Sequence, residues 1–509
     1  MFSYKKGCVF NTLNDIKGKN ITVMGLGLNG GGEACVRFFL KHGANVIATD
    51  MKTEEQLKPT IERLQADKEL NISHLTYRLG EHRIEDFKNA DCVIKNPGVK
   101  IEGNKYLAAA KAIETDISIF LHFTKAPIIA VTGSKGKSST VSATWYGLNK
   151  AGFTAFLGGN ITVSPLTFLE KTNENTPVVL ELSSWQLADL RGRGSLKPKI
   201  SIITKIVPDH QNWYHAMEPY VADKRLIYSD QTCEDYSIFD FEGDEPGTGP
   251  ECGGTWGNFF ANETKAQVLR YANVVSDEKD FLNKNPGFHG VFQTKDSSGN
   301  TFGKILLPGM REPEIIMQKL SVPGEHMKIN ALNAAMVLRL MGVEAEKCAE
   351  IIESWPGIDH RLQFFHEKNG VKFYNDSCAT VPEAAAAASQ SFEKPVYLLT
   401  GGTDKGLSLE PLADTLTGKA NAKYPVKSLY LLGGTATDKL LPSLKEAKIP
   451  YKGPFNNLNE MLTELKNELS QTQHKDDVVV FSPGATSFGM FTNEFDRGNK
   501  YMNAVKEIF

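Results

Sequence analysis

The chain has 509 residues, a formal net charge of -3, 41% hydrophobic residues and 23% charged residues. This length predicts about three globular domains, each large enough to bury a core of its own. The near-balanced charge argues against a general affinity for nucleic acid or anionic membranes. Because no stretch approaches 18 consecutive apolar residues, no membrane-spanning helix is expected.

Seven cysteines are scattered along the chain, and no two of them form a C-x-x-C pair. An odd and dispersed set argues against a disulfide framework and against a cysteine-rich zinc site. No apolar run follows Lys5 and Lys6, so no secretory signal is expected. Together these features predict a protein of the reducing cytoplasm.

Short apolar runs rich in Val and Ile alternate with longer helical patterns, which predicts an α/β chain with parallel sheets covered by helices. The predicted strands are Ile21–Met24, Val46–Thr49, Cys92–Ile94, Ile128–Thr132, Val178–Leu182, Ile200–Thr204, Val371–Asn375, Val396–Thr400, Ser428–Leu432 and Val478–Phe481. We expect three domains: a Rossmann-like domain over 1–123, a central phosphate-loop ATPase domain over 124–357 and a Rossmann-like C-terminal domain over 358–509. The Gly-, Pro- and acid-rich segment 241–262 is expected to be a surface insertion or an irregular loop.

The first predicted strand leads into GLGLNG, Gly25 to Gly30, which matches G-x-G-x-x-G before a helical segment. Asp50 ends the next strand, at about the interval seen in dinucleotide-binding folds. Alone, this fingerprint indicates NAD binding only weakly. The alternative for Gly30–Gly32 is a flexible turn that needs positive φ.

The strongest local signal is TGSKGKSST, Thr132 to Thr140, between a predicted strand and a predicted helix. Gly133 and Gly136 would let backbone amides surround phosphate oxygens at a helix N-terminus. Lys137 would reach the β- and γ-phosphates, and the Ser138 hydroxyl would ligate Mg²⁺. Because the usual first glycine is absent, a glycine turn with solvated lysines remains the alternative.

This shortened phosphate loop resembles that of the Mur ligases and of their relative folylpolyglutamate synthase. Further matching segments, in the family's order and over nearly the whole chain, are GGNI (Gly158–Ile161), ELSSWQL (Glu181–Leu187), DH (Asp209–His210), ADK (Ala222–Lys224), HR (His360–Arg361), NDS-x-AT (Asn375–Thr380) and SPGATSF (Ser482–Phe488). They are most similar to the MurD branch of the Mur ligases.

Three further side chains are candidates for the chemistry. Glu181 ends a strand near the phosphate loop and can hold Mg²⁺, although a helix-capping acid is the alternative. His210 and Lys224 taken alone would be a structural histidine and a solvated helix lysine. The resemblance implies instead that His210 and a carbamylated Lys224 bind a second Mg²⁺, with Lys137, Glu181, His210 and Lys224 forming the catalytic set.

The resemblance also implies three binding sets. ATP would contact Gly133, Ser134, Lys135, Gly136, Lys137, Ser138, Ser139, Asn330, Arg361 and Asp376. The UDP-linked substrate would contact Leu28, Asn29, Asp50, Asn96, Gly98 and Asn160. Glutamate would contact Thr380, Lys405, Ser487 and the position of Cys378.

Cys378 is a departure, because MurD enzymes commonly carry lysine there, and a thiol does not supply that charge at neutral pH. Met327 also stands where the family often has asparagine. The amino-acid substrate is therefore open between D-glutamate, which we expect, and L-glutamate or another amino acid.

The implied function is ATP-dependent addition of D-glutamate to UDP-N-acetylmuramoyl-L-alanine through an acyl phosphate, as a step of peptidoglycan synthesis that serves cell-wall biogenesis, cell shape and cell division. We expect a cytoplasmic monomer without nucleic-acid or membrane partners.

The enzyme alternatives are a Mur-type ligase of other specificity and a folylpolyglutamate synthase-like ligase. The latter has no UDP-binding domain before its phosphate loop, so Gly25–Gly30 argues against it. An amidotransferase-subunit relative carries a four-cysteine zinc insert, which the missing C-x-x-C pairs exclude. A purely regulatory nucleotide-binding protein is the non-enzyme alternative.

Overall fold

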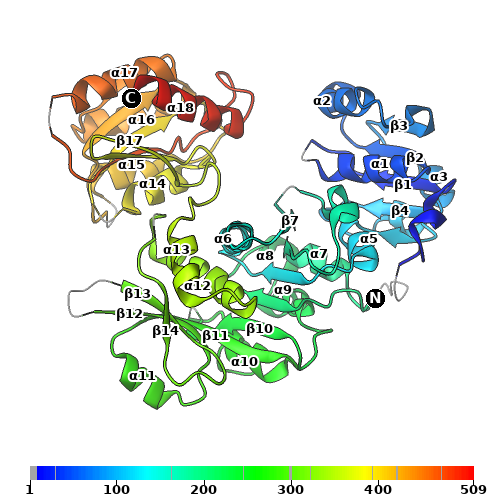
Figure 1. Cartoon of the computed structure of the whole chain (residues 1–509). Coiled ribbons are helices and arrows are strands. Elements are labelled where there is room, and N and C mark those ends of the chain that lie inside the picture. Colours follow the sequence, from blue (N-terminus) through cyan, green and yellow to red (C-terminus); the bar gives the residue numbers. More distant parts are fainter. Residues whose placement is uncertain are drawn as a thin grey trace. The chain divides into compact units, whose positions relative to one another are not determined.

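The computed structural model describes residues 8–28, 30–161, 163–244, 246–296, 301–320, 322–392, 394–419, 422–471 and 473–509. Three sheets follow one another along the chain, each accompanied by helices (Figure 1). All the predicted strands are confirmed, with ends that differ by one residue at most. This mixed α/β architecture confirms the predicted fold class.

The first sheet is parallel and has the strand order β3-β2-β1-β4-β5. Its strands are β1 (Asn20–Met24), β2 (Asn45–Asp50), β3 (Leu75–Leu79), β4 (Cys92–Lys95) and β5 (Ile113–Glu114). Its helices are α1 (Gly31–Lys41), α2 (Glu54–Gln65), α3 (Ile84–Lys88), α4 (Lys105–Ala108) and α5 (Asp116–Phe123). The strand order reverses between β1 and β4, and ligands of such sheets bind at the carboxyl ends of strands at that point.

The second sheet has the order β14-β13-β12-β11-β10-β9-β6-β8-β7, with antiparallel pairing only at β12-β13 and β13-β14. Its strands are β6 (Ile128–Thr132), β7 (Phe156–Gly159), β8 (Val178–Glu181), β9 (Ile200–Ile203), β10 (Tyr236–Asp240), β11 (Gln267–Val275), β12 (Gly290–Lys295), β13 (Thr301–Leu306) and β14 (Glu314–Met317). Its helices are α6 (Lys137–Lys150), α7 (Ser184–Asp189), α8 (Gln211–Tyr214), α9 (Met217–Lys224), α10 (Trp256–Glu263), α11 (Glu278–Lys284), α12 (Glu325–Leu340) and α13 (Ala345–Glu353). The central strand β6 leads directly into the predicted phosphate loop.

The third sheet has the order β15-β16-β20-β17-β18-β19, with β15 antiparallel to β16. Its strands are β15 (Gln363–Lys368), β16 (Val371–Asn375), β17 (Tyr397–Gly401), β18 (Ser428–Leu432), β19 (Lys452–Phe455) and β20 (Asp477–Phe481). Its helices are α14 (Pro382–Gln390), α15 (Glu410–Thr417), α16 (Thr435–Glu446), α17 (Leu458–Leu469) and α18 (Glu494–Ile508). Val478 and Val480 pack into one hydrophobic cluster, and Val479 and Phe481 into another, so helices cover both faces.

The chain forms two compact units, Met1–Gln318 with Ile329–Ile352, and Lys319–Lys328 with Glu353–Phe509. Within the first unit one hydrophobic cluster extends from the first sheet into the second. The ring of Phe120 in α5 lies 5.6 Å from that of Phe168, which stacks on Phe156 of β7 at 5.0 Å. The domain boundaries at 123/124 and 357/358 stay predictions.

The expectation of an irregular segment over 241–262 is wrong for its second half, where α10 begins at Trp256. Thr255 caps this helix by accepting a hydrogen bond from the Asn258 amide. Trp256 is buried, and its indole N–H donates to the Thr248 carbonyl over 2.7 Å. The apolar Trp256 and Phe260 anchor a helix that the polar composition of the segment obscures. In the described part of the chain, no helix has the length and apolar character needed to cross a membrane.

Candidate functional site

The phosphate loop has a shape that glycine alone permits at two positions. Gly133 and Gly136 have φ values of 140° and 94°. A Cβ at position 133 would lie 2.0 Å from Thr204 Oγ1, and a Cβ at position 136 would lie 2.5 Å from Asn330 Oδ1. These contacts bring the predicted ATP residue Asn330 against the loop, which ends at the N-terminus of α6.

Lys137, Ser138 and Ser139 form the partly buried first turn of α6, whereas Lys135 is exposed. The Lys137 Nζ donates to the carbonyl oxygens of Gly133 and Ser134, each over 3.0 Å. A cation and the helix N-terminus are thus found together, which is the arrangement that binds a polyphosphate.

Ser134 has an inward-facing role that the sequence does not reveal. Its hydroxyl donates to the Val207 carbonyl over 2.8 Å and lies 2.9 Å from the Tyr220 hydroxyl oxygen. Its amide donates to the Lys205 carbonyl over 2.9 Å. Ser134 therefore fastens the loop to the segment after β9, while its predicted contact with ATP stays a prediction.

Lys224 lies beneath the phosphate loop, because its Nζ donates to the Gly133 carbonyl over 2.8 Å. The side chain is 2% exposed and packs over the Tyr220 ring at 4.5 Å. Burial, and secondarily the charge of Lys137, lowers the pKa of Lys224 to about 7. Its neighbour Arg225 pairs instead with Glu263. Of these two basic residues, Lys224 is therefore the one that contacts the phosphate loop.

Glu181 ends β8, next to β6 in the sheet, and is almost fully buried. Its Oε1 accepts a hydrogen bond from Asn160 Nδ2 over 3.0 Å, which brings two predicted site residues together. Its Oε2 and the Thr132 Oγ1 are buried, and neither has a hydrogen-bond partner within the described part of the chain. Buried oxygens without donors beside a phosphate loop suit Mg²⁺, which prefers oxygen ligands and shares them with phosphates.

His210 follows β9 and has a left-handed backbone with φ 52°. Its ring lies 4.8 Å from that of Trp185, and its Nε2 lies 3.9 Å from Asp209 Oδ2. Among the residues with described positions, no group of three or more His, Cys, Asp or Glu side chains is arranged to hold a metal. A cation here would therefore take part of its ligand set from a hydroxyl, a modified lysine or a phosphate.

The carboxyl edge of the first sheet holds four of the predicted UDP residues, which are Leu28, Asp50, Asn96 and Gly98. Asp50 accepts hydrogen bonds from the amides of Gly27 and Lys52, each over 2.9 Å, and so shapes the glycine loop. A Cβ on Gly25, where φ is 96°, would lie 3.1 Å from the Asn96 Cβ, so this loop packs on the Asn96 turn.

The predicted UDP residues differ in exposure. Leu28 is 47% exposed, and Asn96 and Gly98 are also exposed. Asn29 lies outside the described residues. Asn160 differs from this group because it follows β7 of the second sheet and contacts Glu181.

The second unit groups the remaining predicted ATP residues. Asp376 accepts from the Ser482 hydroxyl over 2.6 Å and from the Leu362 amide over 3.0 Å, and burial raises its pKa to about 6. Arg361 is exposed. It follows His360, whose carbonyl accepts from the Cys378 amide over 2.9 Å.

Two of the predicted glutamate residues, Thr380 and Lys405, line a small cavity of about 10 Å³. The Lys405 Nζ donates to Thr380 Oγ1 over 3.2 Å. The Thr486 amide donates to the Thr403 carbonyl over 3.0 Å, which draws the buried Ser487 toward the same loop. Burial raises the pKa of the Cys378 thiol to about 11, so this position carries no charge at neutral pH.

Known proteins resemble the chain over nearly its whole length. Residues 19–119 match the family model "Mur ligase MurD-like, N-terminal domain", and residues 131–338 match "Mur ligase middle domain". The chain is 39% identical to the UDP-N-acetylmuramoylalanine--D-glutamate ligase of Treponema pallidum, over 97% of this chain and 98% of the relative. The chain belongs to the Mur ligase family. The equally named protein of Borreliella burgdorferi is 36% identical, over 97% of this chain and 99% of the relative.

Solved Mur ligases share this fold at low sequence identity. The UDP-N-acetylmuramate-alanine ligase MurC of Thermotoga maritima aligns with a TM-score of 0.53 and 17% identity, covering 96% of this chain and 99% of that one. MurF of Acinetobacter baumannii aligns with a TM-score of 0.53 and 16% identity, over 84% and 93% of the two chains. The Mur ligase fold is thereby confirmed.

Arg497 of α18 contacts two of the predicted site segments, and the sequence analysis does not identify it. Its side chain is fully buried and donates to the Ser377 carbonyl over 2.8 Å, the Ser377 hydroxyl over 3.0 Å and the Ala485 carbonyl over 3.0 Å. It thus ties the NDSCAT segment to the SPGATSF segment. No local pattern distinguishes it from a solvated helix arginine, so only the fold reveals it.

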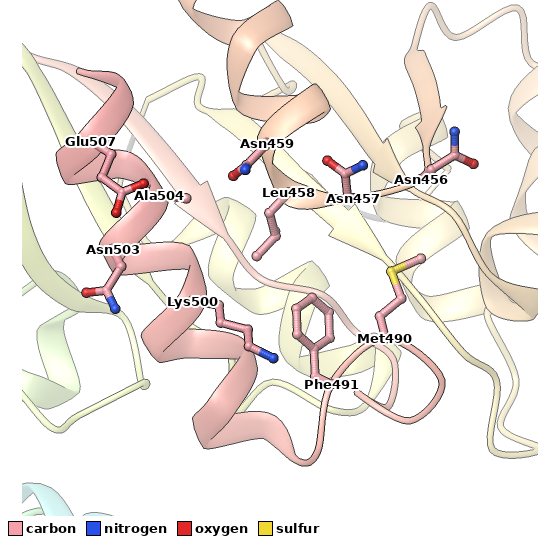
Figure 2. A pocket seen from close by; sticks show the side chains of 10 residues that line it. All are labelled: Asn456, Asn457, Leu458, Asn459, Met490, Phe491, Lys500, Asn503, Ala504 and Glu507. Atoms are coloured by element: carbon pink, nitrogen blue, oxygen red, sulfur yellow. The ribbon is translucent and has the colours of Figure 1, made fainter.

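A larger cavity of about 450 Å³ lies elsewhere in the second unit, between α17, α18 and the segment before α18 (Figure 2). Leu458 and Phe491 line it together with several asparagine side chains. None of the predicted site residues lines this cavity. Cavity volume therefore plays no part in the assignment of the predicted site residues.

Lys137→Ala is expected to abolish phosphate release from ATP while leaving the melting temperature within a few degrees of wild type. The variant loses the ammonium group at the phosphate loop but no buried packing, since Lys137 is partly exposed. Steady-state assays and thermal denaturation check this, with Lys150→Ala, at the exposed C-terminal end of the same helix, as the matched control. Phosphate release above a few per cent of wild type in Lys137→Ala would contradict this role of the loop.

Proposed function

We propose that this Mur ligase joins D-glutamate to UDP-N-acetylmuramoyl-L-alanine in an ATP-dependent step of peptidoglycan precursor synthesis. The main support is near-complete coverage of relatives named as ligases of this reaction, at 39% and 36% identity. The grouping of Lys137, Glu181 and Lys224 around the phosphate loop supports the same chemistry. The match of residues 19–119 to a MurD-like N-terminal model argues against the folylpolyglutamate synthase alternative.

In the first step the carboxylate of the UDP-linked L-alanine attacks the γ-phosphorus of ATP. The bond from that phosphorus to the bridging oxygen breaks, ADP leaves, and an acyl phosphate forms. Both reactants are anionic, so Lys137 and the amides at the N-terminus of α6 stabilise the charge of the transferred phosphoryl group. Glu181, Ser138 and Thr132 would hold Mg²⁺, which supplies further neutralisation of the phosphate oxygens when bound.

In the second step the neutral amine of glutamate attacks the acyl carbon, phosphate leaves with the C–O bonding electrons, and the amide nitrogen loses a proton. Lys405, Thr380 and Ser487 are proposed to hold the side-chain or α-carboxylate of glutamate. Arg361, Asp376 and Asn330 are proposed to contact ATP. Leu28, Asp50, Asn96 and Gly98 are proposed to contact the UDP group, with Asn160 at its sugar-peptide end.

We propose that Lys224 reacts with CO₂ to form a carbamate that, with His210, holds a second Mg²⁺. Only a neutral amine has the lone pair that attacks CO₂; one N–H proton is then lost as the N–C bond forms. The burial that lowers the Lys224 pKa to about 7 supplies this neutral form near physiological pH. The resulting anion would also relieve the crowding of two lysine ammonium groups at the Gly133 carbonyl.

Lys224→Ala is expected to be inactive and to recover part of its activity with millimolar short-chain carboxylic acids, which replace the lost oxygen ligand. In wild type, a ¹³C carbamate signal from ¹³CO₂ is expected above about pH 7. The signal should fall as the pH drops below about 7, because protonation removes the lone pair. Arg225→Ala is the matched control, since Arg225 pairs with Glu263. Full activity of Lys224→Ala would remove the carbamate from the proposal.

The function as a whole is tested by phosphate release from ATP with UDP-N-acetylmuramoyl-L-alanine and a panel of D- and L-amino acids. We expect release with D-glutamate and little with the other members of the panel. A preference for L-glutamate would leave the ligase chemistry intact and change the proposed substrate. This alternative is open because Cys378 stands where MurD enzymes commonly carry lysine. The absence of release with every amino acid would contradict the proposed reaction. The cytoplasmic location and the monomeric state stay predictions.

Cys378→Lys is expected to lower the KM for D-glutamate severalfold while scarcely changing the KM for ATP. The half-buried thiol is uncharged at neutral pH, so lysine adds a cation beside a dianionic substrate. A charge-assisted hydrogen bond contributes about 1.5–3 kcal/mol, or roughly one to two decades in affinity before losses to solvation. Cys378→Met is the uncharged control of similar length. Loss of activity with D-glutamate in the lysine variant would show that the pocket is organised differently.

A further inference from the structure

Lys95 is a buried cation to which neither the sequence analysis nor the proposed reaction assigns a role. It is the last residue of β4, where all the side chains are buried, and its own side chain is only 2% exposed. Lysine at such a position ordinarily extends its ammonium group to solvent along its aliphatic stem. Here the ammonium group stays inside the first unit, so its contacts must compensate a buried charge.

The Lys95 ammonium group is held by main-chain oxygens of the turn that follows it. Its Nζ donates to the carbonyl oxygens of Asn96, Pro97 and Val99 over 3.1, 3.4 and 2.9 Å. An ammonium group has three N–H donors, so these three carbonyls use its hydrogen-bonding capacity. The turn therefore folds around the ammonium group, which leaves Asn96 and Gly98 exposed on its outer side.

The compensating negative charge comes from Asp189 in α7, a helix of the second sheet. The Asp189 Oδ2 lies 2.8 Å from the Lys95 Nζ, and the Asp189 side chain is 7% exposed. Asp189 is the last residue of α7, where the helix dipole disfavours a carboxylate, so helix stability does not explain its presence. α7 follows β8, the strand that ends at Glu181. One ion pair therefore connects the Asn96 turn to the segment that carries the proposed Mg²⁺ carboxylate.

A second contact fastens the same turn to the central region. The Lys100 ammonium group lies over the Trp213 ring, 5.1 Å from its centroid. Trp213 contacts Trp185 at 4.9 Å, and Trp185 contacts His210 at 4.8 Å. The segment 95–100 thus has an attachment at each end, through Lys95 and Lys100, and both lead to residues beside the proposed reaction centre.

We propose that Lys95 is a positioning residue that, paired with Asp189, sets the conformation of the Asn96–Val99 turn and thereby the affinity for the UDP-linked substrate. This inference rests on the proposed function, because it uses the assignment of Asn96 and Gly98 to the UDP group. The ammonium group fixes the carbonyls on the inner side of the turn, and the substrate meets its outer side. Loss of the ammonium group frees three carbonyls, and the turn then spends less time in the binding conformation.

A neighbouring ion pair provides a matched control. Arg193 donates to Glu114 Oε2 over 2.6 Å and to the Ile113 carbonyl over 2.8 Å, with both charged side chains nearly fully buried. It joins the end of β5 to the segment after α7, and so spans the same two sheets as Lys95 and Asp189. These two contacts are made to β5 and not to the Asn96 turn. A general loosening between the two sheets would therefore act equally through either pair.

The test compares Lys95→Met, Asp189→Asn, the double variant Lys95→Met/Asp189→Leu and the control Glu114→Gln. The double variant removes both charges, so that no carboxylate is left buried alone if the single variants fold poorly. In all three variants of the pair, we expect the KM for UDP-N-acetylmuramoyl-L-alanine to rise, by about tenfold where Lys95 is lost. The KM for ATP and for glutamate should stay within about twofold of wild type, and Glu114→Gln should change the melting temperature without a selective change in KM.

Binding of uridine 5′-diphosphate by calorimetry provides a readout that needs no turnover. We expect about tenfold weaker binding in the double variant than in wild type. Unchanged UDP binding and unchanged substrate KM in the double variant would overturn the inference, as would an equal shift in Glu114→Gln. Wild type that binds UDP but releases no phosphate with any amino acid would contradict the proposed function and leave the inference standing on the binding data.

Discussion

The Gly133 carbonyl oxygen is the point on which the proposed catalytic region depends, because two lysines donate to it. Lys137 approaches from α6 and Lys224 from α9, at 3.0 and 2.8 Å. Two ammonium groups at one oxygen repel each other, and the repulsion is strong where water is excluded. Burial of Lys224, and secondarily the charge of Lys137, lowers the pKa of Lys224 to about 7. Glycine fits position 133 because its φ is positive and a Cβ there would meet Thr204 Oγ1.

Cations held by main-chain carbonyls recur at several loops that leave the carboxyl edge of a sheet. Lys95 is held by the turn after β4, and Arg497 by the segments after β16 and β20. Such loops lack a neighbouring strand, so their carbonyl oxygens need donors from elsewhere. A cation with several N–H groups supplies these donors from one side chain. The same physical device therefore shapes the proposed UDP, ATP and glutamate loops.

Much of the fold and part of the site follow from local sequence. The runs of Val and Ile predict the central strands, since residues buried on both faces must be apolar. Short or edge strands such as β3 and β5 carry no comparable signal, and α10 is hidden in a polar segment because only Trp256 and Phe260 anchor it. The sequence pattern predicts Gly133, Gly136 and Lys137 because the strand, the loop and the helix follow one another directly along the chain. Resemblance, not pattern, identifies Lys224.

Local sequence does not predict the role of residues whose contact partners are distant in the sequence. Lys224 contacts Gly133 across 91 positions, and Arg497 contacts Ser377 across 120. In the sequence each is a charged residue, and solvent exposure is the ordinary expectation for a charged residue. When such a residue is buried, its charge is no longer stabilised by water. The charged group must then be stabilised by neighbouring oxygen atoms, or its pKa must shift toward the neutral form. A buried cation in a fold of this kind is therefore a sign of an ordered loop, and the loops so ordered here are those that the proposed substrates would meet.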